Sequence, residues 1–405
     1  MKETKTPTAK PRWLKGIWRQ RLVYSFLRVV MSPFLRLIYG FKCRPYTPKS
    51  SSCLILANHN MAPDQFFLGM AMKKHMRFVA SENILRNGIG GRLIKFLQDP
   101  IPRKKGADAS DTVESIKENL ALGVNVCMFA EGNRSSNGET CFISPRTGEM
   151  VKESTGGLVT FRIIGGYLQS PRWSRFSRKG YLSGEVVHEY ERSVLDKMTA
   201  DEINEAIRRD LFVNAFEEQR RNMHRYKGKR LAENLEKALY ICPVCHGVST
   251  MKSDDDTFRC HKCGHTVKYN EYGFFEGEKV IFDNVYDWDM WQRSYAEEHK
   301  SEWLENTSEP ISVDSGISLY RVENSEMIPV MGVCSAAIYG DRLEFSDGEK
   351  HLVCRLADIE RMGMFTKSTV LFTHDGGYYQ FRGGRQLSPL KFFALYRILS
   401  GQRYY

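Results

Sequence analysis

Residues 54–64 read Leu-Ile-Leu-Ala-Asn-His-Asn-Met-Ala-Pro-Asp, and this stretch decides how the first half of the chain folds. The apolar run 53–57 predicts a short strand that is covered on both faces. Pro63 suits the first turn of a helix, which we expect over residues 64–74. A buried strand followed directly by a helix predicts an α/β fold.

The turn between this strand and this helix carries His59 and Asp64. On a regular helix, five positions would separate the two side chains by about 140°. They can therefore meet only if His59 lies in the loop and Asp64 in the first helical turn. A carboxylate beside an imidazole fixes its tautomer and makes the other ring nitrogen a general base. A polar loop at a strand end, without chemistry, is the alternative interpretation.

A second stretch favours the catalytic interpretation. Residues 124–129 again predict a buried strand, and Ala-Glu-Gly-Asn-Arg-Ser follows at once over 130–135. The carboxyl ends of both predicted strands thus carry polar residues, which we expect to meet at one rim of the sheet.

The two stretches resemble conserved blocks of the glycerolipid acyltransferases, the family of lysophosphatidate and glycerol-3-phosphate acyltransferases. The family's first block, Asn-His-x4-Asp, is matched by Asn58, His59 and Asp64. Its third block, Phe-Pro-Glu-Gly-Thr-Arg-Ser, is matched by Phe129, Glu131, Gly132, Arg134 and Ser135, with Ala130 and Asn133 as departures. Residues 100–103, Pro-Ile-Pro-Arg, resemble the second block, in which an arginine contacts the substrate phosphate.

The resemblance implies an α/β sandwich about a mixed sheet, with His59 and Asp64 as a general-base pair. It implies an acceptor site that is formed by Asn58, Arg103, Glu131, Gly132, Arg134 and Ser135. The donor would be acyl-coenzyme A or acyl carrier protein, and the acceptor a lysophospholipid, with 1-acylglycerol 3-phosphate, giving phosphatidate, as the first candidate. The alternative is a catalytically degenerate adaptor at the membrane, against which the intact His59, Asp64 and Glu131 count.

Positive charge is concentrated near the start of the chain. The 405 residues carry a net charge of +11, yet residues 1–50 hold twelve lysines and arginines against Glu3 alone. No run reaches the roughly 18 uncharged apolar residues of a membrane span. Arginines interrupt the aromatic and aliphatic segment 13–41, which also argues against a cleavable secretory signal. We expect this segment to lie peripherally on anionic lipid at the cytoplasmic face of the membrane; a helix packed on the enzyme is the alternative.

Four of the ten cysteines form a metal-binding pattern. Two Cys-x2-Cys knuckles, with Cys242 and Cys245 in the first and Cys260 and Cys263 in the second, predict a structural Zn²⁺ site. Gly247 and Gly264 are expected at the tight turns. The other six cysteines are scattered singly, which favours a reducing compartment. The acidic residues 254–256 argue against nucleic acid as a partner of this ribbon.

The last third of the chain predicts a small β domain. Alternating strands begin at Gly316, with turns at 339–341 and 374–377, and a helix begins at Ser388. This pattern resembles a pleckstrin-homology-like barrel, whose ligand would be a lipid headgroup or a protein. The basic and aromatic stretch 172–179 is either a solvated loop or a surface for headgroups or coenzyme A phosphates.

The predicted organisation therefore has five parts. They are a basic amphipathic segment over 1–42, an acyltransferase domain over 43–230, a zinc ribbon over 231–275, a helical connector over 276–310 and a pleckstrin-homology-like β domain over 311–405. Further helices are expected over 82–97, 199–221, 231–240 and 286–305.

Overall fold

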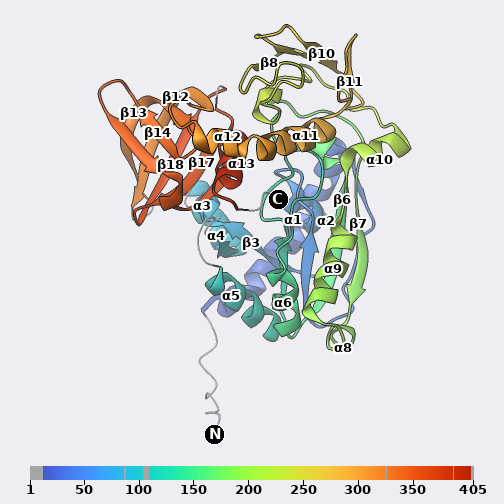
Figure 1. The fold of residues 1–405 in the computed structure, drawn as a ribbon. Coiled ribbons are helices and arrows are strands. Elements are labelled where there is room, and N and C mark those ends of the chain that lie inside the picture. The colour runs from blue at the N-terminus through green and yellow to red at the C-terminus, as the bar shows by residue number, and fades with distance from the viewer. Residues whose placement is uncertain (1–11, 86–87, 104–108, 324–325, 386, 403–405) are drawn as a thin grey trace.

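The structure is a computed structural model that describes residues 12–85, 88–103, 109–323, 326–385 and 387–402. Residues 1–11 of the predicted N-terminal segment lie outside the described residues. Within the described ranges the strands form three sheets: a mixed sheet, a small four-stranded sheet and an antiparallel seven-stranded sheet. Figure 1 shows the mixed sheet in blue and green, and the C-terminal sheet in orange and red.

The mixed sheet organises the first half of the chain. Its strands are β1 (Phe41–Cys43), β2 (Cys53–Ala57), β3 (Met76–Ser81), β4 (Ile101–Arg103), β5 (Asn125–Phe129), β6 (Gly157–Ile164) and β7 (Leu182–Tyr190). Their order is β1-β7-β6-β2-β5-β3-β4, and the β6–β7 pair alone is antiparallel among these neighbours. Strands β2 and β5 are adjacent and parallel, so their carboxyl ends meet at one edge as predicted.

Helices cover both faces of this sheet, which explains why every residue of β2 is buried. Cys53, Ile55 and Ala57 pack with α1 (Ile17–Tyr39) and α2 (Asp64–Ala71). Leu54 and Leu56 point to the other face. They pack with α5 (Ser110–Ala121), α6 (Arg146–Glu153) and α9 (Ala200–Leu211). The α/β sandwich predicted from the sequence is confirmed.

One of the predicted long helices is interrupted, because the segment expected over 199–221 consists of α9 and α10 (Ala215–Asn222). Asn214 ends the interruption, since its side chain accepts hydrogen bonds from the first amides of α10. The described residues of the segment expected over 82–97 form α3 (Glu82–Leu85) and α4 (Gly88–Gln98). The remaining short helices of this half are η1 (Arg12–Gly16), α7 (Gly166–Gln169) and α8 (Arg192–Leu195).

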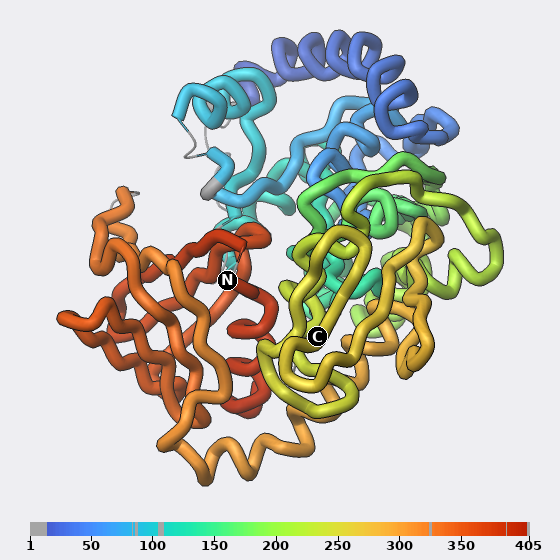
Figure 2. The backbone as a smooth tube through the Cα atoms, turned by 90° about the horizontal axis from the view of Figure 1, so that it is seen from above, coloured from blue at the N-terminus to red at the C-terminus, as the bar shows by residue number. Residues whose placement is uncertain are grey.

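Helix α1 lies along the outside of the molecule, and α4 adjoins its first turns (Figure 2). Tyr24 anchors α1 to α2, because its hydroxyl donates to the carbonyls of Gly69 and Met72 at 3.2 and 2.9 Å. By its length and composition, the segment 14–39 is long and apolar enough to cross a membrane. This criterion tolerates two charged residues, whereas the sequence expectation concerned uncharged runs, which Arg28 and Arg36 interrupt here.

The second sheet belongs to the predicted zinc ribbon. It consists of β8 (Met251–Asp254), β9 (Thr257–Cys260), β10 (Thr266–Tyr269) and β11 (Phe275–Glu276), in the order β11-β10-β9-β8. The helix expected over 231–240 is wrong, since this segment forms turns and the short η2 (Leu235–Lys237). Asn234 has a left-handed backbone with φ +71°, and this conformation ends a regular α-helix.

The third sheet forms the C-terminal part of the molecule. Helices α11 (Val285–Glu298) and α12 (Lys300–Glu305) lead to β12 (Ser312–Glu323), β13 (Glu326–Ile338), β14 (Arg342–Ser346), β15 (His351–Arg355), η3 (Leu356–Asp358), β16 (Ile359–Thr366), β17 (Thr369–His374), β18 (Gly377–Gly383) and α13 (Pro389–Leu399). The order is β15-β14-β13-β12-β18-β17-β16. The β-rich region with a terminal helix is confirmed, and Ser388 caps α13 by accepting a bond from the amide of Lys391.

One apolar core joins all three parts. It includes Tyr167 and Trp173 next to the first sheet, Phe258 of the ribbon, Trp288 of α11 and Leu390 of α13. The ribbon is therefore packed into the body of the molecule and does not hang from a linker.

Candidate active site

His59 and Asp64 meet as the sequence predicts. His59 lies in the loop after β2, and Asp64 is the first residue of α2. The Nδ1 atom of His59 lies 2.8 Å from Oδ2 of Asp64. Asp64 is fully buried, whereas the His59 side chain remains 20% exposed. An imidazole that donates its Nδ1 hydrogen to a carboxylate has Nε2 as its basic nitrogen.

The Asp64 carboxylate also shapes the loop that carries His59. Its Oδ2 accepts hydrogen bonds from the amides of Asn60 and Met61 at 2.7 and 2.8 Å. The same oxygen therefore fixes both the backbone of the loop and the orientation of the imidazole. The His59 ring in turn stacks on the ring of Phe129, with centroids 4.1 Å apart and planes 15° apart.

Glu131 connects the two sequence blocks through backbone groups. One of its carboxylate oxygens accepts a bond from the amide of His59 and the other from the amide of Cys141, both at 2.5 Å. Burial raises the pKa of this carboxyl to about 8, although the two amide bonds act in the opposite direction. Both oxygens are thus used within the protein, and this placement gives no support to the expected contact with an acceptor hydroxyl.

Asn58 and Ser135 are likewise buried and directed into the protein. The Asn58 amide bonds both the N–H and the carbonyl of Ile163, which joins β2 to β6. The amide of Ser135 donates to the carbonyl of His59 at 3.0 Å. These residues, which the family resemblance placed in the acceptor site, hold the loops around His59.

A cavity of about 1160 Å³ extends from His59. This exceeds the roughly 300–1,000 Å³ that is usual for a small-molecule site. Apolar side chains form much of its wall, among them Leu27 of α1, Phe66 and Met70 of α2, Leu93 of α4 and Ile116 of α5. An apolar volume of this size next to His59 is suited to a long hydrocarbon chain.

Three of the predicted acceptor-site residues do line the cavity, namely Arg103, Gly132 and Arg134. Arg103 ends β4, and burial lowers the pKa of Arg134 while Asp64 acts against that shift. The sequence analysis missed other lining residues: Arg172, which is buried, and Arg361, Phe365 and Thr366 of the C-terminal sheet. The basic stretch 172–179 hinted at the first of these, but no local pattern singles out a residue of β16.

Residues 41–164 match the sequence model of the Acyltransferase family. The chain contains an acyltransferase domain. The matched range begins at β1 and ends at β6, so it includes both the His59–Asp64 pair and the loop with Arg134. The family resemblance proposed from the sequence is confirmed.

Solved structures with similar parts were also found. The 1-acyl-sn-glycerophosphate acyltransferase PlsC from Thermotoga maritima is 15% identical over 50% of this chain and 80% of that chain, with a TM-score of 0.38. The Vps36 N-terminal PH domain is 16% identical over 23% of this chain and 80% of that chain, with a TM-score of 0.19. The inner membrane complex protein ISP3 from Toxoplasma gondii is 13% identical over 26% and 84%, with a TM-score of 0.18. The search of curated proteins gave no match.

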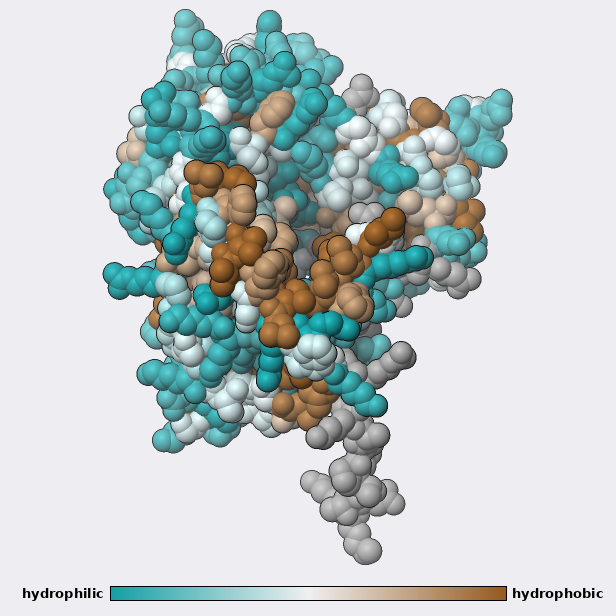
Figure 3. Space-filling view, turned by 180° about the vertical axis from the view of Figure 1, so that it is seen from behind, coloured by the Kyte–Doolittle hydropathy of each residue, from teal (hydrophilic) through white to brown (hydrophobic). Residues whose placement is uncertain are grey.

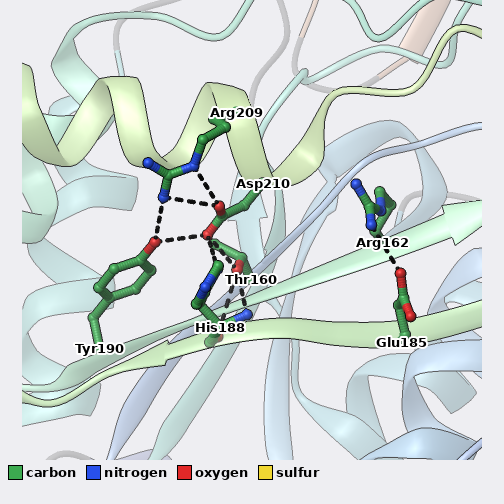
Figure 4. Close-up of polar contacts among 7 residues, drawn as sticks. All are labelled: Thr160, Arg162, Glu185, His188, Tyr190, Arg209 and Asp210. Carbon is green, nitrogen blue, oxygen red and sulfur yellow. Dashed lines mark hydrogen bonds and ion pairs between the residues drawn. The ribbon is translucent and has the colours of Figure 1, made fainter.

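The acyltransferase domain contains a second histidine–aspartate pair, which Figure 4 shows. Asp210 of α9 lies 3.1 Å from Nδ1 of His188 and accepts bonds from the hydroxyls of Thr160 and Tyr190 at 2.9 and 2.8 Å. None of these four residues lines the cavity. The second pair therefore attaches α9 to β6 and β7, and it offers a matched control for the first.

The four predicted metal ligands also come together. The sulfur atoms of Cys242, Cys245, Cys260 and Cys263 all lie within 4.8 Å of one another, and two of the distances are 3.7 and 3.6 Å. Four sulfurs at about 2.3 Å from a tetrahedral metal ion would be about 3.8 Å apart. The cluster therefore fits a metal ion and leaves no open position for a substrate.

The turns of the two knuckles differ from the expectation. Gly264 has a left-handed backbone with φ +81°, but in the first knuckle the equivalent residue is His246, with φ +56°. Gly247 is needed for space instead, because a Cβ atom there would lie 2.6 Å from the Thr250 side chain.

Proposed function

We propose that the chain transfers an acyl group from an acyl thioester, acyl-coenzyme A or acyl carrier protein, to a hydroxyl of a lysophospholipid. The proposed acceptor is 1-acylglycerol 3-phosphate and the product is phosphatidate. The observation that carries this proposal is the His59–Asp64 pair at a large cavity that combines apolar walls with arginines.

The proposed reaction uses His59 as a general base. Its Nε2 takes the proton from the acceptor hydroxyl while that oxygen attacks the carbonyl carbon of the thioester. The C–O bond forms and the C–S bond breaks, and the leaving thiolate takes the proton back from the imidazolium. Asp64 orients the ring and stabilises the imidazolium during this transfer. No covalent enzyme intermediate is required.

The cavity supplies the binding groups for both ends of such an acceptor. Its apolar residues surround the hydrocarbon chain, and Arg103 and Arg134 pair with the phosphate. Planar guanidinium groups suit this contact because they form two parallel, charge-assisted hydrogen bonds to phosphate oxygens. Glu131, Asn58 and Ser135 act indirectly, since they hold the backbone that presents His59.

Helices α1 and α4 are the proposed membrane contact. The exposed apolar residues of α1 are Trp18, Leu22, Phe26, Val29, Val30, Phe34, Leu37 and Ile38, and those of α4 are Ile89, Leu93, Ile94 and Phe96. Figure 3 shows brown, apolar side chains gathered on the face opposite that of Figure 1. The two helices are joined by Arg19, whose guanidinium donates to the carbonyl of Phe96 at 2.9 Å and lies over its ring.

The cavity opens within this apolar surface. Phe66, Ile84, Leu93 and Ile94 line the cavity and are exposed as well. A lipid acceptor can thus pass from a bilayer to His59 along apolar side chains. Because α1 is packed against α2, we propose that α1 lies in the headgroup region on the cytoplasmic side of the membrane and does not cross the bilayer. Its arginines would bind anionic lipid.

Zinc is the proposed occupant of the four-cysteine cluster. Four thiolates in tetrahedral arrangement are typical of structural Zn²⁺ sites. In this position the ion would stabilise the ribbon and take no part in acyl transfer.

The test is acyl transfer by purified protein from labelled acyl thioesters to a panel of lysolipids. His59→Ala should lower turnover by roughly 10²–10⁴-fold, the usual contribution of a general base. His188→Ala is the control, since it removes the histidine of the other pair outside the cavity. A wild-type protein that transfers no acyl group would instead support the adaptor role.

A further inference from the structure

The C-terminal sheet forms part of the wall of the active-site cavity. Arg361, Phe365 and Thr366 of β16 line the cavity together with His59 and Arg134 of the acyltransferase domain. Figure 1 shows this sheet beside α3 and α4, at the end of the mixed sheet where β3 lies. The acyltransferase domain alone therefore leaves the cavity without one of its walls.

The turn of the β16–β17 hairpin is attached to the acyltransferase domain and to the segment that leads into the ribbon. The Nζ of Lys367 donates to the carbonyl of Ser174 at 3.2 Å, and Lys237 donates to the carbonyl of Lys367 at 3.3 Å. A small second cavity between the parts is lined by Arg172, Thr366 and Lys367, among others. These contacts fix the position of β16 relative to Arg134.

Positive charge dominates the wall of the large cavity. The charged residues that line the large cavity are Arg28, Arg103, Arg134, Arg146, Arg172 and Arg361 against Glu149 and Glu153. Among the described residues, neither Arg134 nor Arg361 has a side-chain hydrogen bond or an ion pair. Burial lowers the pKa of Lys367, and Arg134 and Arg175 lower it further, which places a third cation near Arg134.

Arg361 is exposed at the cavity wall, whereas Arg134 is partly buried. An unpaired cation that is partly removed from water, as Arg134 is, is costly, and an anionic ligand removes the cost. We propose that the β16–β17 hairpin completes an anion site in the cavity, in which Arg361 binds a phosphate group of a substrate together with Arg134. This inference rests on the proposed function, and it makes Arg361 a specificity-determining residue that the C-terminal sheet supplies. The phosphate belongs either to the acceptor, as a phosphate monoester, or to the coenzyme A portion of the donor.

Binding of inorganic phosphate to the full chain tests the site without any turnover. We expect Arg361→Gln, which removes the charge and keeps a polar side chain, to raise the calorimetric Kd for phosphate about tenfold or more. Arg382→Gln is the matched control, because Arg382 is an exposed arginine of the same sheet that lies over Tyr320 and outside the cavity. The proposal would be overturned if Arg361→Gln bound phosphate as well as the wild type, or if the control weakened binding equally. It would also be overturned if the wild type bound no phosphate.

Steady-state kinetics then distinguish the two sources of phosphate. If the acceptor supplies it, Arg361→Gln should raise KM for 1-acylglycerol 3-phosphate about tenfold and leave KM for monoacylglycerol unchanged. If the donor supplies it, KM should rise for acyl-coenzyme A and not for an acyl-pantetheine thioester that lacks the phosphates. Active protein with all four KM values unaltered by Arg361→Gln contradicts this inference while the proposed function stands. Phosphate binding that depends on Arg361 in a protein without acyl transfer contradicts the proposed function alone.

Discussion

Replacing Asp64 by asparagine removes the charge of the carboxylate and keeps the shape of the side chain. An asparagine oxygen can still accept the bonds from the amides of Asn60 and Met61, so the loop should keep its shape. What disappears is the negative charge next to His59. Because Asp64 is fully buried and His59 is only 20% exposed, water cannot replace that charge.

The size of the effect follows from Coulomb's law. Two unit charges about 4 Å apart interact by about 4 kcal/mol at an effective dielectric constant of about 20. Since about 1.4 kcal/mol corresponds to a tenfold change in rate, full loss of this term would slow the reaction about 10³-fold. The asparagine oxygen still accepts the hydrogen bond from Nδ1 of His59, so its dipole compensates in part. We therefore expect kcat to fall by roughly 10²–10³-fold.

Release of free thiol from an acyl thioester measures this directly, with a short-chain acceptor in solution so that membrane binding does not limit the rate. Asp210→Asn is the matched control, because Asp210 is equally buried and also bonds a histidine Nδ1, yet lies away from the cavity. Rates are normalised to folded protein by circular dichroism. Turnover of Asp64→Asn within about threefold of wild type, or an equal loss in Asp210→Asn, would refute the reasoning.

Three other predictions concern the metal, the pH dependence and the membrane. Elemental analysis should find one zinc ion per chain, and Cys260→Ser should release it; gently purified protein without zinc would exclude the site. Burial lowers the pKa of His75 to about 4, and the nearby Arg21 and Arg77 act in the same direction. The free energy of unfolding should therefore fall by at most about 3 kcal/mol as the pH falls from about 6.5 to about 4. Urea unfolding should show this pH dependence in the wild type and lose it in His75→Gln. Leu37→Glu should reduce the fraction of protein that sediments with anionic liposomes about tenfold or more. Val333→Glu, at a similarly exposed apolar position of β13, should not reduce it. Equal behaviour of the two variants would argue against α1 as the membrane contact.

Much of the site could be predicted because its signals are local. The apolar run of β2, the spacing of His59 and Asp64 and the paired Cys-x2-Cys knuckles each specify a structure within a few residues. The C-terminal helix was predicted from Ser388 and Pro389 for the same reason, since a cap and a first-turn proline act within one turn. The structure contains the His59–Asp64 contact, the cluster of four cysteines and the cap of the C-terminal helix, each with the expected partners.

Features that depend on distant contacts could not be predicted. Glu131 resembles a substrate-binding residue in sequence, but its partners are backbone amides whose positions only the assembled loops define. Arg361 belongs to a strand with ordinary alternation, and its place in the cavity depends on how the third sheet packs on the first. The segment 231–240 has helical periodicity, yet burial of Leu231, Leu235 and Leu239 in the shared core accompanies an irregular backbone.

The wall that β16 contributes has a consequence for synthesis on the ribosome. Helix α1, the proposed membrane contact, is made before His59, whereas Arg361, which belongs to the C-terminal sheet, is made some 300 residues later than His59. A nascent chain can thus reach the bilayer long before its catalytic cavity is enclosed. If the proposed function holds, acyl transfer requires that the C-terminal sheet has packed on the acyltransferase domain, because β16 supplies part of the cavity wall.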